Sequence, residues 1–243
     1  MNADNKRIMK NTAFLYFRMI LILLVTLYTS RVVLKELGVE DYGIYNVVGG
    51  VVAMFSVITN SLSQAISRFI TFELGTIRKE RLKKIFSTSL SIQIALSSIV
   101  FILAEIMGVW FLNHHMNIPA ERMNSANWVL QCSLLMFVIN LLVVPYNAAI
   151  IAHEHMQAFA YISILEAMLK LIVAFAISSA FFDSLKFYAL LLLLVTFVVS
   201  GTYKFYSSGH FMECKCKPQF DKELFHEMFS FASWNFISAL SGV

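Results

Sequence analysis

Long apolar stretches, separated by short polar segments, dominate the sequence. Each complete stretch reaches the roughly 20 residues that an α-helix needs to cross the hydrocarbon core of a bilayer. The six complete stretches are Thr12–Leu34, Tyr42–Ser67, Ile85–Leu112, Trp128–Ile151, Tyr161–Phe182 and Phe187–Tyr206. A seventh begins at Phe229 and supplies about 22 Å of helix before Val243. The pattern predicts an all-α, polytopic transmembrane bundle with six complete spans and the start of a seventh.

The same pattern predicts three parts along the chain. Residues 1–206 form an N-terminal six-helix transmembrane bundle, and residues 229–243 begin a second, truncated bundle. Residues 207–228 form a cytoplasmic linker in which Phe220, Leu224 and Met228 recur at helical spacing. The linker is predicted to be either an amphipathic surface helix or an ordinary connector. We therefore expect the chain to be the N-terminal part of a longer protein.

Composition supports a membrane protein. Apolar residues make up 58% of the chain and charged residues 14%, whereas a soluble domain carries about 25% charged residues. The net charge of +4 comes from short loops between spans, which argues against nucleic-acid binding. Lys and Arg cluster at the N-terminus, in the second loop and after the sixth span, so the positive-inside rule predicts a cytoplasmic N-terminus.

Neither metal chemistry nor catalysis is indicated. Cys214-Lys-Cys216 and His153-Glu-His155 lack further well-spaced ligands, so no metal site is predicted, and the three cysteines imply no disulfide framework. The sequence contains no glycine-rich phosphate loop, HExxH helix or nucleophile elbow. We expect no enzyme activity and no cofactor. Whether H⁺ or Na⁺ is coupled to function stays open.

Charged residues inside the predicted spans are the first candidate functional residues, because a charge at that depth is costly unless it faces protein or water. Arg18 is predicted either to face a cavity or to anchor the helix by reaching the interface. Glu166 and Lys170 lie four residues apart and share a helix face. They form either a structural pair or the lining of a hydrated cavity.

A polar stripe runs along the second span. Its members recur every four residues and cannot all face lipid: Ser56, Asn60, Gln64 and Arg68. We expect Arg18 and Arg68 to border the cytoplasmic mouth of one cavity, where guanidinium groups suit phosphate oxygens. Arg68 is alternatively a positive-inside anchor.

The fourth span contains Pro145, which removes a backbone donor and predicts a kink. We treat Pro145 as a candidate hinge and nearby Asn147 as a candidate cavity residue. A static packing feature is the alternative for the proline.

Residues 30–50 read SRVVLKELGVEDYGIYNVVGG, and Ser67-Arg-Phe follows. This stretch, above all its LGxxxYGxY junction between the first two spans, resembles the start of bacterial polysaccharide (O-antigen type) flippases. These belong to the MATE-like transporter superfamily. Residues 144–156 and 161–166 resemble a lipopolysaccharide-biosynthesis subgroup.

The resemblance implies two six-helix bundles around a central cavity, of which this chain supplies the first. The implied substrate is an undecaprenyl-diphosphate-linked oligosaccharide, moved across the bacterial inner membrane for lipopolysaccharide, O-antigen or capsule synthesis. Implied partners are the lipid bilayer and other glycan-assembly proteins. Cavity arginines in such proteins engage the diphosphate, so Arg18, Arg31 and Arg68 are candidates by position and charge. Arg31 is alternatively a boundary residue.

On this resemblance we expect alternating access, with polar groups such as Asn60, Gln64 and Asn147 facing the sugars. The main alternative is a MATE-type cation-coupled multidrug exporter, which should carry an unpaired membrane carboxylate. Glu166 has Lys170 beside it, which argues against that alternative. A membrane glycan enzyme would need a sizeable outer loop, and a non-transporting scaffold stays open.

Overall fold

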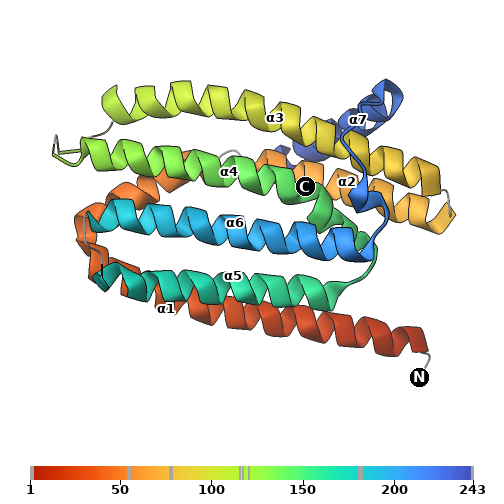
Figure 1. Ribbon diagram of the computed structural model, residues 1–243, viewed down its shortest axis with the longest axis horizontal. Coiled ribbons are helices and arrows are strands. Elements are labelled where there is room, and N and C mark those ends of the chain that lie inside the picture. The colour runs from red at the N-terminus through yellow and green to blue at the C-terminus, as the bar shows by residue number, and fades with distance from the viewer. Residues whose placement is uncertain are drawn as a thin grey trace.

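The computed structural model describes residues 3–53, 56–76, 79–114, 116, 118–119, 121–179 and 183–241. All regular structure in these ranges is helical (Figure 1). The helices are α1 (Ala3–Ala53), α2 (Ser56–Thr76), α3 (Lys79–His114), α4 (Met123–Ala152), α5 (Met156–Ala176), α6 (Ser184–His210) and α7 (Lys222–Ser241). Short 3₁₀ turns, η1 (Ile177–Ser179) and η2 (Glu213–Lys215), follow α5 and α6.

The long helices run up and down beside one another (Figure 1). One end of the bundle holds the N-terminus and the α2–α3, α4–α5 and α6–α7 connections, and the other holds the α3–α4 and α5–α6 connections. Helix α4 packs against α1, α2, α3, α5 and α6. Its apolar residues are spread around the whole helix, which suits this central position.

A corner at Gly38 divides α1 into two arms. Gly38 has φ 81° and ψ 170°, a backbone conformation open essentially to glycine alone. The chain turns back there, so that residues 39–53 and then α2 return toward the end that holds the N-terminus (Figure 1). The predicted second span, Tyr42–Ser67, is therefore divided between α1 and α2.

Within the part of the chain that the structure describes, five helical segments are long and apolar enough to cross a membrane: Thr12–Gly50, Glu80–His114, Met123–Ala152, Met156–Ser179 and Ser184–His210. The all-α, multi-span class is confirmed, although these candidates number five rather than the six spans predicted. Helix α2 is not among them because polar and charged residues such as Gln64, Arg68 and Glu73 lower its apolarity.

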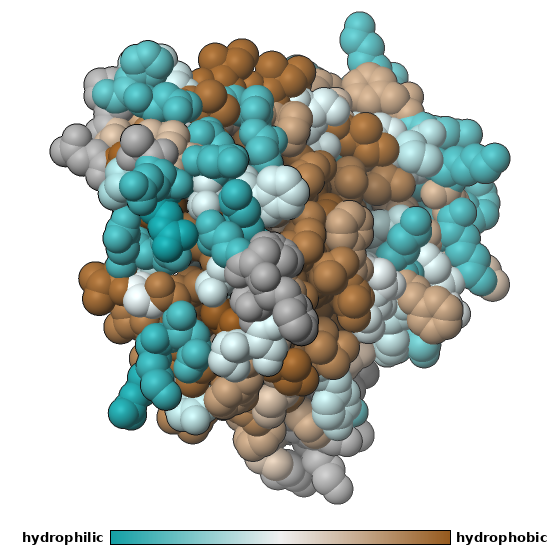
Figure 2. All heavy atoms as spheres, turned by 60° about the vertical axis from the view of Figure 1, so that its left-hand side comes forward, coloured by the Kyte–Doolittle hydropathy of each residue, from teal (hydrophilic) through white to brown (hydrophobic). Residues whose placement is uncertain are grey.

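Packing and exposure fit a bilayer. Phe86 and Tyr146 meet edge to face in the core, with ring centroids 5.2 Å apart, and α3 comes close to α4 where Gly108 faces Leu130. On the outside of α1, Leu23, Leu24 and Leu27 are exposed. Figure 2 shows an apolar band lying between hydrophilic regions.

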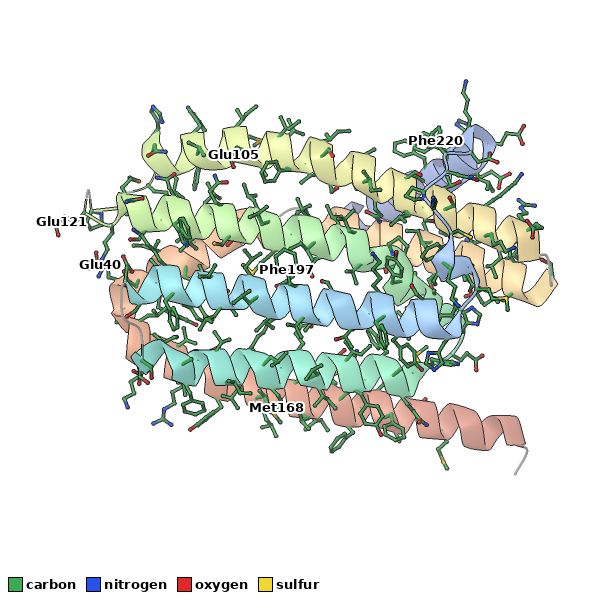
Figure 3. All side chains as sticks on the ribbon, in the orientation of Figure 1. Glu40, Glu105, Glu121, Met168, Phe197 and Phe220 are labelled. Carbon is green, nitrogen blue, oxygen red and sulfur yellow. The ribbon has the colours of Figure 1, made fainter. Side chains whose placement is uncertain are left out.

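The two ends carry the charges and the linker. Glu40 and Glu121 lie at the corner end, and Phe220 lies at the opposite end (Figure 3). The boundary expected between residues 228 and 229 falls inside α7, which is continuous from Lys222. The Asp221 carboxylate accepts hydrogen bonds from the first-turn N–H groups of Glu223 and Leu224, as a helix N-cap does. Helix α7 packs against α2 and α3 with Leu224 and Met228 buried.

Candidate functional site

A groove of about 590 Å³ runs along one face of α2 and reaches the end of α4. We call it the α2 groove; its lining is Ser63, Gln64, Ser67, Arg68, Thr71, Phe72 and Ile151. Gln64 and Arg68 lie one helical turn apart, so both side chains meet the groove from the same face. The side chains of Ser56 and Asn60, the other members of the predicted stripe, lie outside the described residues.

Arg68 is exposed in the α2 groove and is held by an aromatic contact. Its guanidinium carbon lies 4.2 Å from the ring centroid of Phe231 in α7, a cation–π distance. Among the residues that the structure describes, no carboxylate lies within ion-pair distance of Arg68. Because the ring covers a face of the planar group, N–H donors at its edge remain directed outward. The groove therefore offers a fixed positive charge among hydroxyl groups.

Arg18 is placed differently, between α1 and α5. Its Nη1 donates to Ser163 Oγ at 3.4 Å, and its guanidinium carbon lies 4.5 Å from the Phe159 ring centroid. Its Nε is buried without a hydrogen-bond partner. The contacts described for Arg18 and Arg68 have no residue in common, so the structure does not bring Arg18 into the α2 groove. Arg31 is exposed on α1, seven residues before the corner at Gly38.

Glu166 and Lys170 form the i,i+4 pair that their spacing predicts. Lys170 Nζ donates to Glu166 Oε1 at 2.6 Å, and both side chains are partly exposed, 47% for Lys170 and 38% for Glu166. Lys170 also lines a second pocket of about 200 Å³ between the two arms of α1, α5 and α6. We call this the corner pocket, because its α1 residues flank Gly38.

Pro145 lies inside α4, which remains a single helix from Met123 to Ala152. The carbonyl of the next residue, Tyr146, accepts a hydrogen bond from Ser207 in α6. Asn147 is half-buried, and its Oδ1 has no hydrogen-bond partner. Neither Pro145 nor Asn147 is among the residues that line the α2 groove.

An ion-pair cluster at the corner end was missed by the sequence reasoning. Arg122 contacts the buried carboxylate of Asp41 (3.4 Å) and that of Asp183 (3.3 Å). Asp183 also accepts from Ser125 Oγ and caps α6 through the Leu185 N–H. Burial alone would raise the pKa of Asp183, but these hydrogen bonds and Arg122 lower it. Of these interactions, only the N-cap that Asp183 provides to α6 can be recognised from the local sequence.

A second cluster, at the opposite end, fixes the segment after α6. His153 bonds the Glu213 carboxylate at 2.5 Å, and its ring stacks on Phe211 with centroids 4.0 Å apart. Burial opposes ionisation of Glu213, yet the His153 bond holds the pKa of that carboxyl below its usual value. Within the described ranges, no three His, Cys, Asp or Glu side chains are grouped so that they could hold a metal.

Three comparisons agree with this architecture. Residues 8–243 match the family described as "Polysaccharide biosynthesis protein". A curated relative, the "Uncharacterized membrane protein EpsK" of Bacillus subtilis (strain 168), is 25% identical over 138 residues, which are 57% of this chain and 26% of EpsK. A solved MATE family multidrug resistance transporter of the MOP superfamily, in an outward-facing conformation, has 17% sequence identity and a TM-score of 0.78.

The structural match covers 97% of this chain and 53% of the solved transporter. The chain therefore has the fold of about half of a MATE transporter and is a multi-pass membrane protein. The family match extends over nearly its whole length, from the first apolar span into α7. On that match, the chain belongs to the polysaccharide biosynthesis protein family.

Proposed function

We propose that the chain is the first lobe of a transporter that flips an undecaprenyl-diphosphate-linked oligosaccharide from the cytoplasmic to the outer leaflet. The second crossing is made by residues 39–53 together with α2, which gives six spans. The N-terminus faces the cytoplasm, because Lys and Arg are concentrated at that end of the bundle. The glycan is destined for lipopolysaccharide, O-antigen or capsule at the inner membrane.

The observation that carries the proposal is the α2 groove. Arg68 lies eight residues before the end of α2, about 12 Å along the helix, and Ile151 lies next to the end of α4. The groove is thus near the proposed cytoplasmic end, where the substrate is made. A guanidinium with no described carboxylate partner, surrounded by Ser and Thr hydroxyls, suits the oxygens of a diphosphate.

In this proposal, Arg68 holds the diphosphate, Gln64 and Asn60 face its sugars, and the lipid tail stays in the bilayer. Rocking of this lobe against a second lobe then exposes the sugars outside. Arg18 contributes from the α1–α5 contact, and Asn147 and the hinge at Pro145 contribute from α4. Glu166 and Lys170 exchange partners as the lobe moves, with H⁺ or Na⁺ as the coupling ion.

The runner-up is a MATE-type multidrug exporter, the kind of transporter whose solved structure shares this fold. A cationic drug would need an unpaired carboxylate in the cavity. Glu166 is bonded to Lys170 at 2.6 Å, and the described lining of the α2 groove contains Arg68 and no acid. The charge of the groove therefore favours an anionic substrate.

Complementation of a bacterial strain that lacks its polysaccharide flippase tests the proposal. The complete gene should restore surface glycan, and Arg68→Ala should abolish that restoration at matched expression. Lys204→Ala, which removes an exposed charge from α6, is the control and should restore glycan fully. Export of cationic dyes without glycan would favour the drug exporter instead.

A further inference from the structure

The corner pocket is chemically different from the α2 groove. Its walls come from both arms of α1, from α5 and from α6. Thr29 and Tyr42 lie within nine residues of Gly38, and Tyr188 lies four residues after the start of α6. The pocket is therefore near the corner end of the lobe, away from the α2 groove, which lies near the opposite end.

Hydroxyl and amide groups supply most of the polar lining: Thr26, Thr29, Ser30, Tyr42, Tyr45 and Asn46. Each of these side chains can both donate and accept hydrogen bonds. Thr29 Oγ1 is buried and has no partner, and a buried polar atom without a partner costs free energy. A ligand with several hydroxyl groups would supply the missing bond.

The charge of the pocket argues for a neutral ligand. Lys170 is the one charged residue among those described as lining it, and its ammonium is bonded to Glu166 at 2.6 Å. That pair leaves no net charge to bind a phosphate. The α2 groove differs, because Arg68 there has no carboxylate partner among the described residues.

Size and shape limit the ligand further. The pocket measures about 200 Å³, below the approximately 300 Å³ at which pockets for drug-sized ligands begin. The Tyr45 and Tyr188 rings meet edge to face there, with centroids 5.0 Å apart. Aromatic rings with polar tips offer an apolar surface beside hydrogen-bonding groups, which matches the C–H face and hydroxyl rim of one pyranose ring.

We propose that the corner pocket binds a single neutral pyranose unit of the glycan. It is a sugar subsite separate from the diphosphate groove, and it lies in the half of the lobe nearer the outer leaflet. A sugar held there would be engaged late in translocation, when the glycan has passed beyond the α2 groove. This inference rests on the proposed function and adds a second subsite to it.

Binding of simple sugars to the full chain in lipid nanodiscs tests the subsite. The probes are the methyl pyranosides of glucose and galactose and N-acetylglucosamine, followed by saturation-transfer NMR, with pyrophosphate as the anionic probe. At least one sugar should bind saturably. Thr29→Val removes the unpartnered hydroxyl at constant shape and should weaken sugar binding about fivefold, the effect of one hydrogen bond.

Thr202→Val is the matched control, since its hydroxyl on the exposed side of α6 donates to the Val198 carbonyl of its own helix. It should leave sugar binding unchanged, and Thr29→Val should leave pyrophosphate binding unchanged. Asn46→Ala should also weaken sugar binding, and it serves as the test of the subsite if Thr29→Val disturbs the fold. No saturable sugar binding, or sugar binding that both pocket variants leave intact, would overturn the subsite. Persistence of Arg68-dependent pyrophosphate binding and glycan export would then show that the proposed function survives without it.

Discussion

Replacing Gly38 by alanine should destabilise the lobe through the backbone alone. Gly38 has φ 81° and ψ 170°, and holding a residue with a side chain there costs about 1–3 kcal/mol. A Cβ at this position would meet no atom within 4 Å, so no steric clash adds to that cost. Alanine also lowers the entropy of the unfolded chain, which offsets about 0.4–1 kcal/mol. At the midpoints of these two ranges, the net loss of stability is about 1.3 kcal/mol.

Gly43→Ala is a control within the same α1 helix. Gly43 is also exposed and also has no atom within 4 Å of an added Cβ, but it lies inside the helical arm after the corner. Alanine there should stabilise the lobe by about 0.5–1 kcal/mol. The difference between the two variants isolates the backbone strain at Gly38. Equilibrium unfolding in detergent micelles, followed by tryptophan fluorescence, measures both; a Gly38→Ala lobe as stable as Gly43→Ala would refute the reasoning.

Two further predictions concern the ends of the bundle. Arg122→Gln should destabilise the lobe by about 2 kcal/mol, because Asp41 is buried and would lose its ion pair. In the same unfolding assay the control Lys35→Gln, which breaks an exposed ion pair, should lower stability far less. Equal losses of stability in the two variants would contradict a stabilising role for the Arg122 cluster. Stability should also fall on acidification. Burial and two neighbouring histidines lower the pKa of His155 from its ordinary 6.5, so its contribution is present above pH 6.5 and is lost as the pH falls toward the lowered value. Glu213, whose pKa lies below 4.5, adds a second loss at lower pH. Thermal unfolding between pH of about 7 and 5 should show the first step, and His155→Gln should remove it; an unchanged step would exclude His155 as its source.

Local sequence spacing predicted the features that depend on one helix. The Glu166–Lys170 bond forms because the two residues lie one turn apart on α5. The common face of Gln64 and Arg68 on α2 follows for the same reason. Apolar length likewise located the helices, because a spanning segment must satisfy its backbone internally.

Features that join distant segments could not be read from spacing. Arg18 meets Ser163, which lies 145 residues further along the chain, so its separation from Arg68 is a property of packing. Arg122 pairs with Asp41 and Asp183, which lie far from it in the sequence. A single arginine in a loop does not reveal which distant carboxylates it contacts. Gly38 belongs to the LGxxxYGxY motif, but a glycine in a sequence does not by itself reveal a positive φ or a corner in the helix.

The central claim is that Arg68 binds the diphosphate of a lipid-linked glycan during its translocation. The most direct test reconstitutes the full-length protein in liposomes and measures flipping of a fluorescent undecaprenyl-diphosphate oligosaccharide. We predict flipping by the parent protein and by Lys204→Ala, and loss of flipping in Arg68→Ala. Flipping that is unaffected by Arg68→Ala, or absent from a parent protein that transports cationic dyes, would contradict the claim.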